Sequence, residues 1–222
     1  MRAVREATAR LTDVRPENVV IACSHTHYGP LTEPHRDEQA PQVESYLANL
    51  VHLLAGAVVM ARARAVPCRL GFGQGEVRIG INRRERTADG QIILGQNPSG
   101  PVDPRVAVLR IDGVDGRPLA AALNYACHPV SLGSQCTDIS ADFPGTARRL
   151  VEEQTGAMCL FLQGASGDLG PKDGYVGDTT HFDAVDGNYV AYVVSKMTGS
   201  AQKVTVVPVR LTSLPCCSFS VG

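Results

Sequence analysis

Two histidines separated by a single residue, His25 and His27, follow an apolar run in the segment "VVIACSHTHYGP". On an extended chain, residues i and i+2 point to the same face, so a strand that continues through them would turn both imidazoles toward one cavity. On a helix they would diverge by roughly 200°. Neutral imidazole is the commonest zinc ligand, and two or three histidines with a carboxylate leave an open position for water. By itself this pair is a weak signal, because polar residues also occur where strands end.

Two further apolar segments end in residues that could complete such a site. The run "AALNYACHP" ends at His128, and "CLFLQGASGD" ends in a glycine-rich turn and Asp168. Open α/β sheets place ligand sites at the carboxyl ends of strands, so neighbouring strands would bring three imidazoles and one carboxylate to one edge. A zinc ion bound there lowers the pKa of its water from 15.7 to about 7. Taken singly, His128 could cap a turn and Asp168 could be an ordinary turn residue, so the hypothesis depends on the three segments occurring together.

The elements that would position these residues mix helices with strands. Apolar periodicity predicts four helices, over residues 1–12, 40–65, 144–156 and 188–198. The pairs Asp89-Gly90 and Asp115-Gly116 each indicate a β-hairpin between extended segments. We also expect strands at 19–23, at 157–164 and, as an edge strand, at 203–211. Because hairpins and crossovers both occur, the prediction is an α/β fold with a mixed β-sheet flanked by α-helices.

The composition predicts one domain over residues 1–222. The chain has 44% hydrophobic residues and a formal net charge of -1 without a basic block, so we expect no nucleic-acid or anionic-membrane partner. We expect no transmembrane segment, since we find no apolar run long enough to span a bilayer. The first residues lack the apolar core of a secretory signal, which predicts a cytoplasmic protein, or a secreted one if a signal precedes this chain. The oligomeric state stays open.

The seven cysteines are scattered and include no Cys-x-x-Cys pair. This argues against a disulfide framework and against a cysteine-rich zinc knuckle. Cys23, Cys127 and Cys159 lie inside apolar runs, and we predict that they are small buried hydrophobic residues.

Two other kinds of site are weaker alternatives. Ser166 could be the nucleophile of a serine hydrolase, but a nucleophile elbow needs glycine two residues later, where this chain has Asp168. The stretch "GFGQGE" could bind a phosphate, but it lacks the Gly-x-Gly-x-x-Gly spacing and a Lys-Ser/Thr pair. A turn-rich strand is the better interpretation of that stretch.

Several motifs, in this order, resemble the catalytic domain of the neutral/alkaline, non-lysosomal ceramidases and their bacterial relatives. They are "SHTHYGP", "INRR", "NPSGPVD", "NYACHP", "SADFPG" and "FLQGASGDLGP", and they extend from about Val19 to Pro171. The resemblance covers most of the chain, which would then be a partial catalytic domain. It is specific to the superfamily and not to ceramide as the substrate.

The resemblance implies a zinc-dependent hydrolase that cleaves the C–N bond of a small-molecule or lipid amide. It implies that His25 and His128 are zinc ligands and that His27 faces the substrate carbonyl and stabilises the oxyanion. It further implies that Arg83 lines the site and binds substrate, and that Asp168 is the general base for the zinc-bound water.

Two departures from the family pattern leave an alternative open. Gly170 stands where the family has a serine, which makes direct attack by water more plausible than an acyl-enzyme. The family also completes its zinc site with a glutamate and a tyrosine, which we would expect downstream of this chain. The alternative is therefore a catalytically inactive ceramidase-like domain or fragment. Asp142 matches a family aspartate, but it could equally cap the helix that opens at Pro144.

Overall fold

The structure is a computed structural model that describes residues 1–30, 32, 41–134, 136–172 and 209–210. The predicted helix at 188–198 and most of the predicted strand at 203–211 lie outside these residues. The chain divides into two compact units. The first comprises Met1–Ala22 and Gly29–Val66, and the second comprises Cys23–Tyr28 and the described part of Pro67–Gly222. The prediction of one domain over 1–222 stays a prediction.

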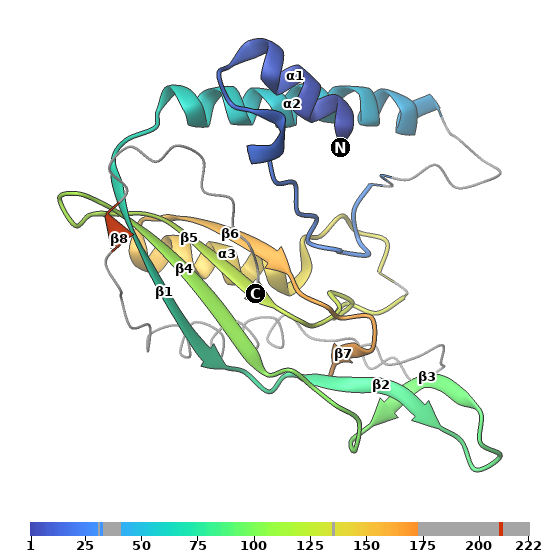
Figure 1. Cartoon of the computed structure of the whole chain (residues 1–222). Coiled ribbons are helices and arrows are strands. Elements are labelled where there is room, and N and C mark those ends of the chain that lie inside the picture. Colours follow the sequence, from blue (N-terminus) through green and yellow to red (C-terminus); the bar gives the residue numbers. More distant parts are fainter. Residues whose placement is uncertain (31, 33–40, 135, 173–208, 211–222) are drawn as a thin grey trace. The chain divides into compact units, whose positions relative to one another are not determined.

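The first unit is helical. It contains α1 (Arg2–Leu11), the 3₁₀ turn η1 (Pro16–Asn18) and the long helix α2 (Pro41–Ala63). Figure 1 shows α1 lying alongside α2, and Arg62 of α2 donates two hydrogen bonds to the Asp13 carboxylate, at 2.6 and 2.7 Å. Both helices confirm the predicted elements.

Residues 19–23 do not form the predicted strand. The side chain of Val20 is 82% exposed and Cys23 is exposed as well, so the prediction of a buried Cys23 is also wrong. A short apolar run becomes a strand only when another strand supplies its hydrogen-bond partners, and none does so among the described residues.

Helix α2 is more apolar than expected. By length and composition it could cross a membrane, and only 6% of the qualifying window is buried within the described residues. The expectation that no apolar run has this length is therefore corrected. Asn49 and His52 interrupt the run of apolar residues, but the helix is continuous and its mean hydropathy stays high. Signal sequences and buried helices of soluble proteins satisfy the same criterion, so it does not by itself assign a membrane.

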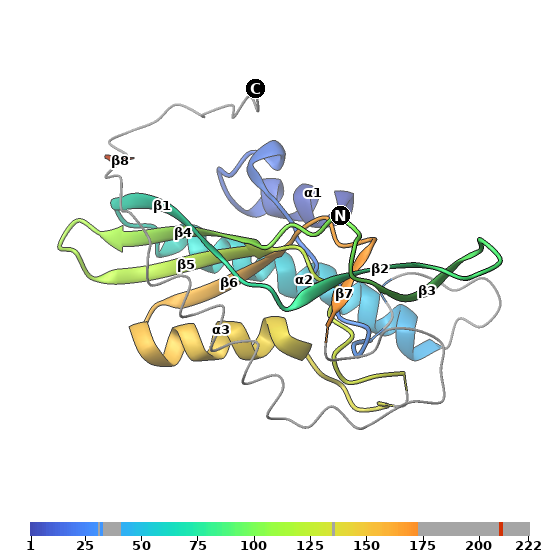
Figure 2. The same cartoon turned by 90° about the horizontal axis from the view of Figure 1, so that it is seen from below.

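The second unit is built on a five-stranded sheet in the order β6-β5-β4-β1-β8. Its strands are β1 (Cys68–Glu76), β4 (Arg105–Gly113), β5 (Pro118–Tyr125), β6 (Met158–Gln163) and β8 (Val209–Arg210). Only β5 and β6 are parallel, and α3 (Asp142–Thr155) is the crossover between them. Figures 1 and 2 show α3 running along one face of this sheet. The predicted mixed sheet and the β4–β5 hairpin are confirmed.

The core of this unit lies between the sheet and α3. Phe143 of α3 and Phe161 of β6 pack edge to face with ring centroids 5.7 Å apart, and burial of each ring contributes about 1.5–3 kcal/mol. Cys127 and Cys159 are buried in the same core, as predicted. Helix α3 begins two residues before the predicted start and ends at Gly156, whose φ of 68° is the left-handed conformation that glycine adopts freely.

A second, smaller sheet has the order β3-β2-β7 and is antiparallel throughout. It consists of β2 (Gly80–Arg86), β3 (Ile92–Asn97) and β7 (Leu169–Pro171). The β2–β3 hairpin turns at Gly90, as predicted. Pairing of β7 with β2 places the residue before β7, Asp168, beside Arg83, whose backbone N–H donates to the Asp168 carbonyl at 2.8 Å.

Candidate metal centre

The parallel pair β5–β6 brings two of the predicted site segments to one edge. The two strands pair up to Tyr125 and Gln163, so their carboxyl ends lie side by side. His128 follows β5 by three residues, and Asp168 follows β6 by five. The backbone N–H of His128 donates to the Leu169 carbonyl at 3.1 Å, which joins the two segments. The expected convergence is confirmed for these two strands.

The histidine pair reaches the same place on a loop and not on a strand. His25 has a φ of 65°, in the left-handed region, so the predicted strand through His25 and His27 is wrong. Hydrogen bonds with a distant segment hold the loop: the Thr26 hydroxyl donates to the Ser140 carbonyl at 2.8 Å, and the Ser140 N–H donates to the Tyr28 carbonyl at 2.7 Å. The imidazoles of His25 and His27 nevertheless lie close, with centroids 5.2 Å apart.

Three imidazoles form one cluster. Three ring nitrogens, one from each of His25, His27 and His128, all lie within 4.8 Å of one another. The Nε2 atoms of His25 and His128 are 3.0 Å apart, although 103 residues separate them in the sequence. His128 is buried, whereas His25 and His27 are exposed, so the cluster has a protein-covered side and a solvent side.

The orientation of His128 is fixed by the chain that follows β6. Its Nδ1 lies 2.8 Å from the Ser166 carbonyl oxygen. Because a carbonyl only accepts, Nδ1 carries the proton and the neutral ring presents an unprotonated Nε2 to His25. Metal-ligating histidines are commonly oriented by this kind of bond from the other ring nitrogen.

The surroundings favour neutral imidazoles. The pKa of His128 is lowered to about 4: burial is the largest cause, the bond to the Ser166 carbonyl opposes it, and the Arg83 guanidinium, His25 and His27 act in the same direction as burial. Burial also lowers the pKa of His27, with His25 and then Arg83 acting in the same direction. A neutral imidazole is the form that coordinates a metal.

This donor set fits a divalent metal ion such as zinc. Zinc binds imidazole nitrogen at about 2.0–2.1 Å, so two ligands in tetrahedral geometry have nitrogens about 3.3 Å apart. The separation of 3.0 Å between the Nε2 atoms of His25 and His128 is close to this value. His27 could be a third ligand or could face substrate, as the resemblance implies, and its assignment to substrate stays a prediction.

Asp168 is held in place by Asn82, a buried residue that was not among the predicted site residues. The Nδ2 group of Asn82 donates to Asp168 Oδ2 and to the Pro101 carbonyl, each at 3.2 Å. Its Oδ1 accepts the N–H of Arg84 at 3.0 Å. A Cβ at Gly100 would lie 2.5 Å from the Asn82 side chain, so the "NPSG" turn needs glycine there. Asn82 is the second residue of the "INRR" motif, and that motif was the sequence signal that could have identified it.

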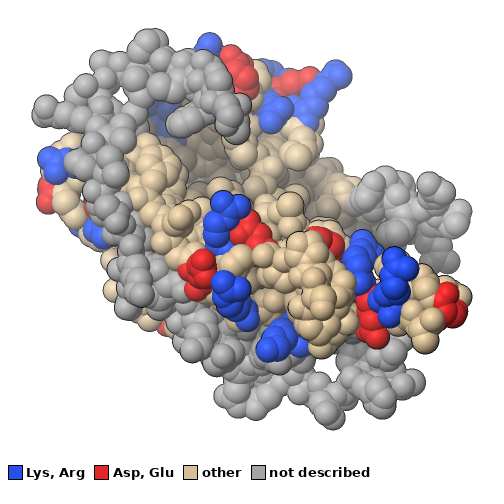
Figure 3. Space-filling view, turned by 60° about the horizontal axis from the view of Figure 1, so that its bottom comes forward, with Lys and Arg blue, Asp and Glu red and all other residues tan. Residues whose placement is uncertain are grey.

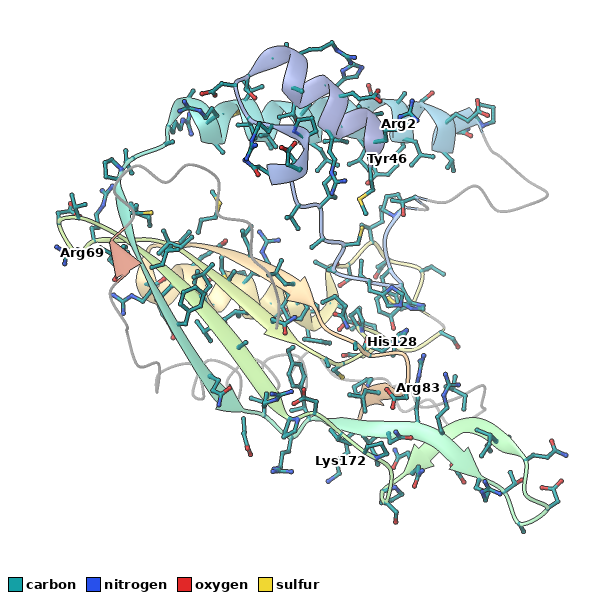
Figure 4. The ribbon with its side chains drawn as sticks, in the orientation of Figure 1. Arg2, Tyr46, Arg69, Arg83, His128 and Lys172 are labelled. Atoms are coloured by element: carbon teal, nitrogen blue, oxygen red, sulfur yellow. The ribbon has the colours of Figure 1, made fainter. Side chains whose placement is uncertain are left out.

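Arg83 borders the cluster, as the resemblance implies. Figure 4 shows its side chain extending from β2 on the side where His128 lies. Its Nε and Nη2 donate to the Gly167 carbonyl at 3.2 and 3.0 Å, and Nη2 lies 3.5 Å from His128 Nε2. A role in substrate binding is consistent with this position and stays a prediction.

The Asp142 side chain binds backbone N–H groups of two segments. Its buried carboxylate accepts the N–H of Ser131 at 2.8 Å and the N–H of Phe143. Burial raises the pKa of Asp142, and these hydrogen bonds oppose the rise. The side chain thus ties the loop after His128 to the start of α3. Asp142 is not the predicted cap, because it is the first residue of the helix and the N-cap residue is Ala141.

Ser166 is buried and acts through its backbone. Its hydroxyl accepts a hydrogen bond from Gln163 Nε2 at 2.7 Å, while its carbonyl orients His128. We predict that Ser166→Ala keeps stoichiometric zinc and changes the rate of amide hydrolysis less than about tenfold, with a loss of stability of about 1 kcal/mol from the missing hydrogen bond. Zinc analysis, steady-state kinetics and thermal unfolding test this. Complete loss of activity with zinc still bound would instead support the serine hydrolase.

Comparisons with known proteins agree with the fold. No protein-family model and no curated protein matches the sequence. Among solved structures, the chain is similar to the neutral ceramidase from Pseudomonas aeruginosa, with a TM-score of 0.67 and 23% identity over 91% of this chain and 35% of that one. It is similar to a ceramidase complexed with C2, with a TM-score of 0.66 and 23% identity over 91% and 34% of the two chains. The fold is ceramidase-like, and the chain spans about a third of the length of these structures.

Proposed function

We propose that this chain is part of a zinc-dependent hydrolase that cleaves the C–N bond of an amide, as neutral ceramidases do. The observation that carries the proposal is the convergence of His25, His27 and His128, with His128 oriented by a backbone carbonyl. The ceramidase-like fold supports it. The substrate class is a small-molecule or lipid amide, and ceramide is one member of that class.

The residues around the cluster can be given roles in such a reaction. A bound zinc ion would supply a Lewis acid that polarises the amide carbonyl and acidifies water. Asp168 would accept the proton of the attacking water, and the Asn82 amide holds its carboxylate for that purpose. His27 would donate its ring N–H to the developing oxyanion, an interaction worth roughly 3–4 kcal/mol for a well-placed donor.

Arg83 would add positive charge beside the reacting carbonyl. Its Nη2 lies 3.5 Å from His128 Nε2, so negative charge that develops near this imidazole is also close to the guanidinium. Such a fixed charge costs no reorganisation during the reaction. Gly170 lies in β7 and carries no hydroxyl, which is consistent with direct attack by water.

The proposal is tested by amide hydrolysis with and without metal. Zinc-loaded protein should hydrolyse a short-chain ceramide or a simple anilide, and a chelator should abolish the activity until zinc is added back, because Asp168 alone is a weak activator of water. Liquid chromatography of the released acid measures the rate. Turnover that survives complete removal of metal would contradict the proposal. Stoichiometric zinc without hydrolysis of any amide would support the inactive ceramidase-like domain.

A further inference from the structure

Two consecutive arginines of β2 reach the same backbone oxygen. Arg83 Nη2 and Arg84 Nη2 donate to the Gly167 carbonyl at 3.0 and 3.1 Å. Consecutive residues of a regular strand point to opposite faces, so this convergence needs a local cause. The register between β2 and β3 shifts between Asn82 and Arg84, and such a bulge twists the strand and redirects side chains. Two guanidinium groups therefore lie on one side of β2.

The pair lies next to the imidazole cluster. Gly167 precedes Asp168, and Arg83 connects the Gly167 carbonyl with the neighbourhood of His128 Nε2. Figure 4 shows Arg83 and His128 close together, and Figure 3 shows basic side chains, interspersed with acidic ones, over the β2–β3 hairpin. An anion bound by the two guanidinium groups would lie beside the amide that reacts at the cluster.

The charge of Arg84 is not balanced within the part of the chain that the structure describes. Arg84 is exposed, its side chain bonds only to the Gly167 carbonyl there, and no carboxylate lies within ion-pair distance of it. The nearest acidic residues in sequence are engaged elsewhere: Glu85 accepts the N–H of Gln96 at 2.8 Å, and Asp168 accepts from Asn82. A guanidinium has five N–H donors in a planar fork that suits a carboxylate, so most donors of Arg84 are available.

We propose that Arg84, together with Arg83, binds a carboxylate of the substrate, so that the amide cleaved at this site is an anionic one. The carboxylate lies on the acyl or the amine side of the scissile bond. This inference rests on the proposed function, which supplies the claim that the group cleaved is an amide. It assigns to Arg84 a part in substrate selection, because a charge-assisted hydrogen bond to a guanidinium is stronger than one to a neutral donor.

Two pairs of probes test the inference. On the acyl side, the monoanilide of succinic acid is compared with uncharged butyranilide. On the amine side, N-benzoylglycine is compared with its uncharged methylamide. Titration calorimetry with zinc-loaded protein measures binding, and chromatography measures hydrolysis. In at least one pair the anionic member should bind about tenfold tighter or more, as one charge-assisted hydrogen bond predicts.

Variants of exposed β2 residues identify the source of the preference. Arg84→Ser should remove it, and Arg84→Lys should keep part of it, because an ammonium group lacks the planar fork. Arg86→Ser removes the same charge from an exposed position two residues further along β2 and should leave the preference unchanged.

Each outcome decides one claim. Equal binding of charged and uncharged probes in both pairs, or an equal loss in Arg84→Ser and Arg86→Ser, would overturn the carboxylate site. Anion binding that depends on Arg84, without hydrolysis of any probe or of a short-chain ceramide, would keep this site and refute the proposed function. Hydrolysis of the probes without a preference for the anionic ones would keep the proposed function and refute the carboxylate site.

Discussion

Replacement of His25 and His128 together by alanine should remove stoichiometric zinc and abolish amide hydrolysis. The double variant lacks the two Nε2 atoms that lie 3.0 Å apart, and of the three clustered imidazoles only the exposed His27 remains. Loss of the metal removes several kcal/mol of transition-state stabilisation, which corresponds to a fall in rate of about a thousandfold or more. Atomic absorption after dialysis measures the zinc, and the anilide assay measures the rate.

Matched variants separate metal loss from unfolding. His128→Ala removes one of the two hydrogen bonds to the buried Ser166 carbonyl, which still accepts from the Leu169 N–H at 3.1 Å, at a cost of about 1 kcal/mol. His25→Ala, at an exposed position, avoids this cost and should still weaken zinc binding by itself. His52→Ala removes an exposed histidine of α2 outside the cluster and should change neither zinc nor activity. Zinc retained by both the double variant and His25→Ala would contradict the account.

Asp168→Asn should keep zinc but lower kcat by about 10²–10⁴-fold, the usual contribution of a general base. The asparagine carbonyl can still accept the hydrogen bond from Asn82, so the side chain keeps its place while it loses the ability to take a proton. Zinc analysis and steady-state kinetics check both parts. The control is Asp115→Asn in the β4–β5 turn, which should behave as the wild type. Wild-type kcat in Asp168→Asn would remove Asp168 from the mechanism.

The sequence predicted the parts of the site that depend on simple topology. A crossover helix between two apolar runs indicates a parallel pair, and a parallel pair places His128 and Asp168 at one edge. The histidine pair was found by residue type and spacing, but for the wrong structural reason. The left-handed backbone of His25 is maintained by bonds between Thr26, Tyr28 and Ser140, and no local pattern reveals a contact over 114 residues.

Tertiary contacts also explain the other differences. Asn82 acquires its position from the glycine turn at Gly100 and from Asp168, which are distant in sequence. Strand periodicity would place Arg83 and Arg84 on opposite faces, and only the bulge opposite β3 brings them together. Cys23 lies in an apolar run like that of Cys159, but no strand among the described residues pairs with residues 19–23, and Cys23 is exposed. Patterns identify apolar segments, while packing decides which of them are buried.

A crystal structure of the zinc-loaded protein, with anomalous scattering measured at the zinc edge, tests the central claim most directly. We predict one strong peak between the side chains of His25 and His128, with zinc about 2.0–2.1 Å from each Nε2. Asp168 should lie close enough to accept a proton from a water in the open position. A zinc peak about 2.3 Å from a cysteine sulfur, or the absence of any peak in a protein that still hydrolyses amides, would contradict the account.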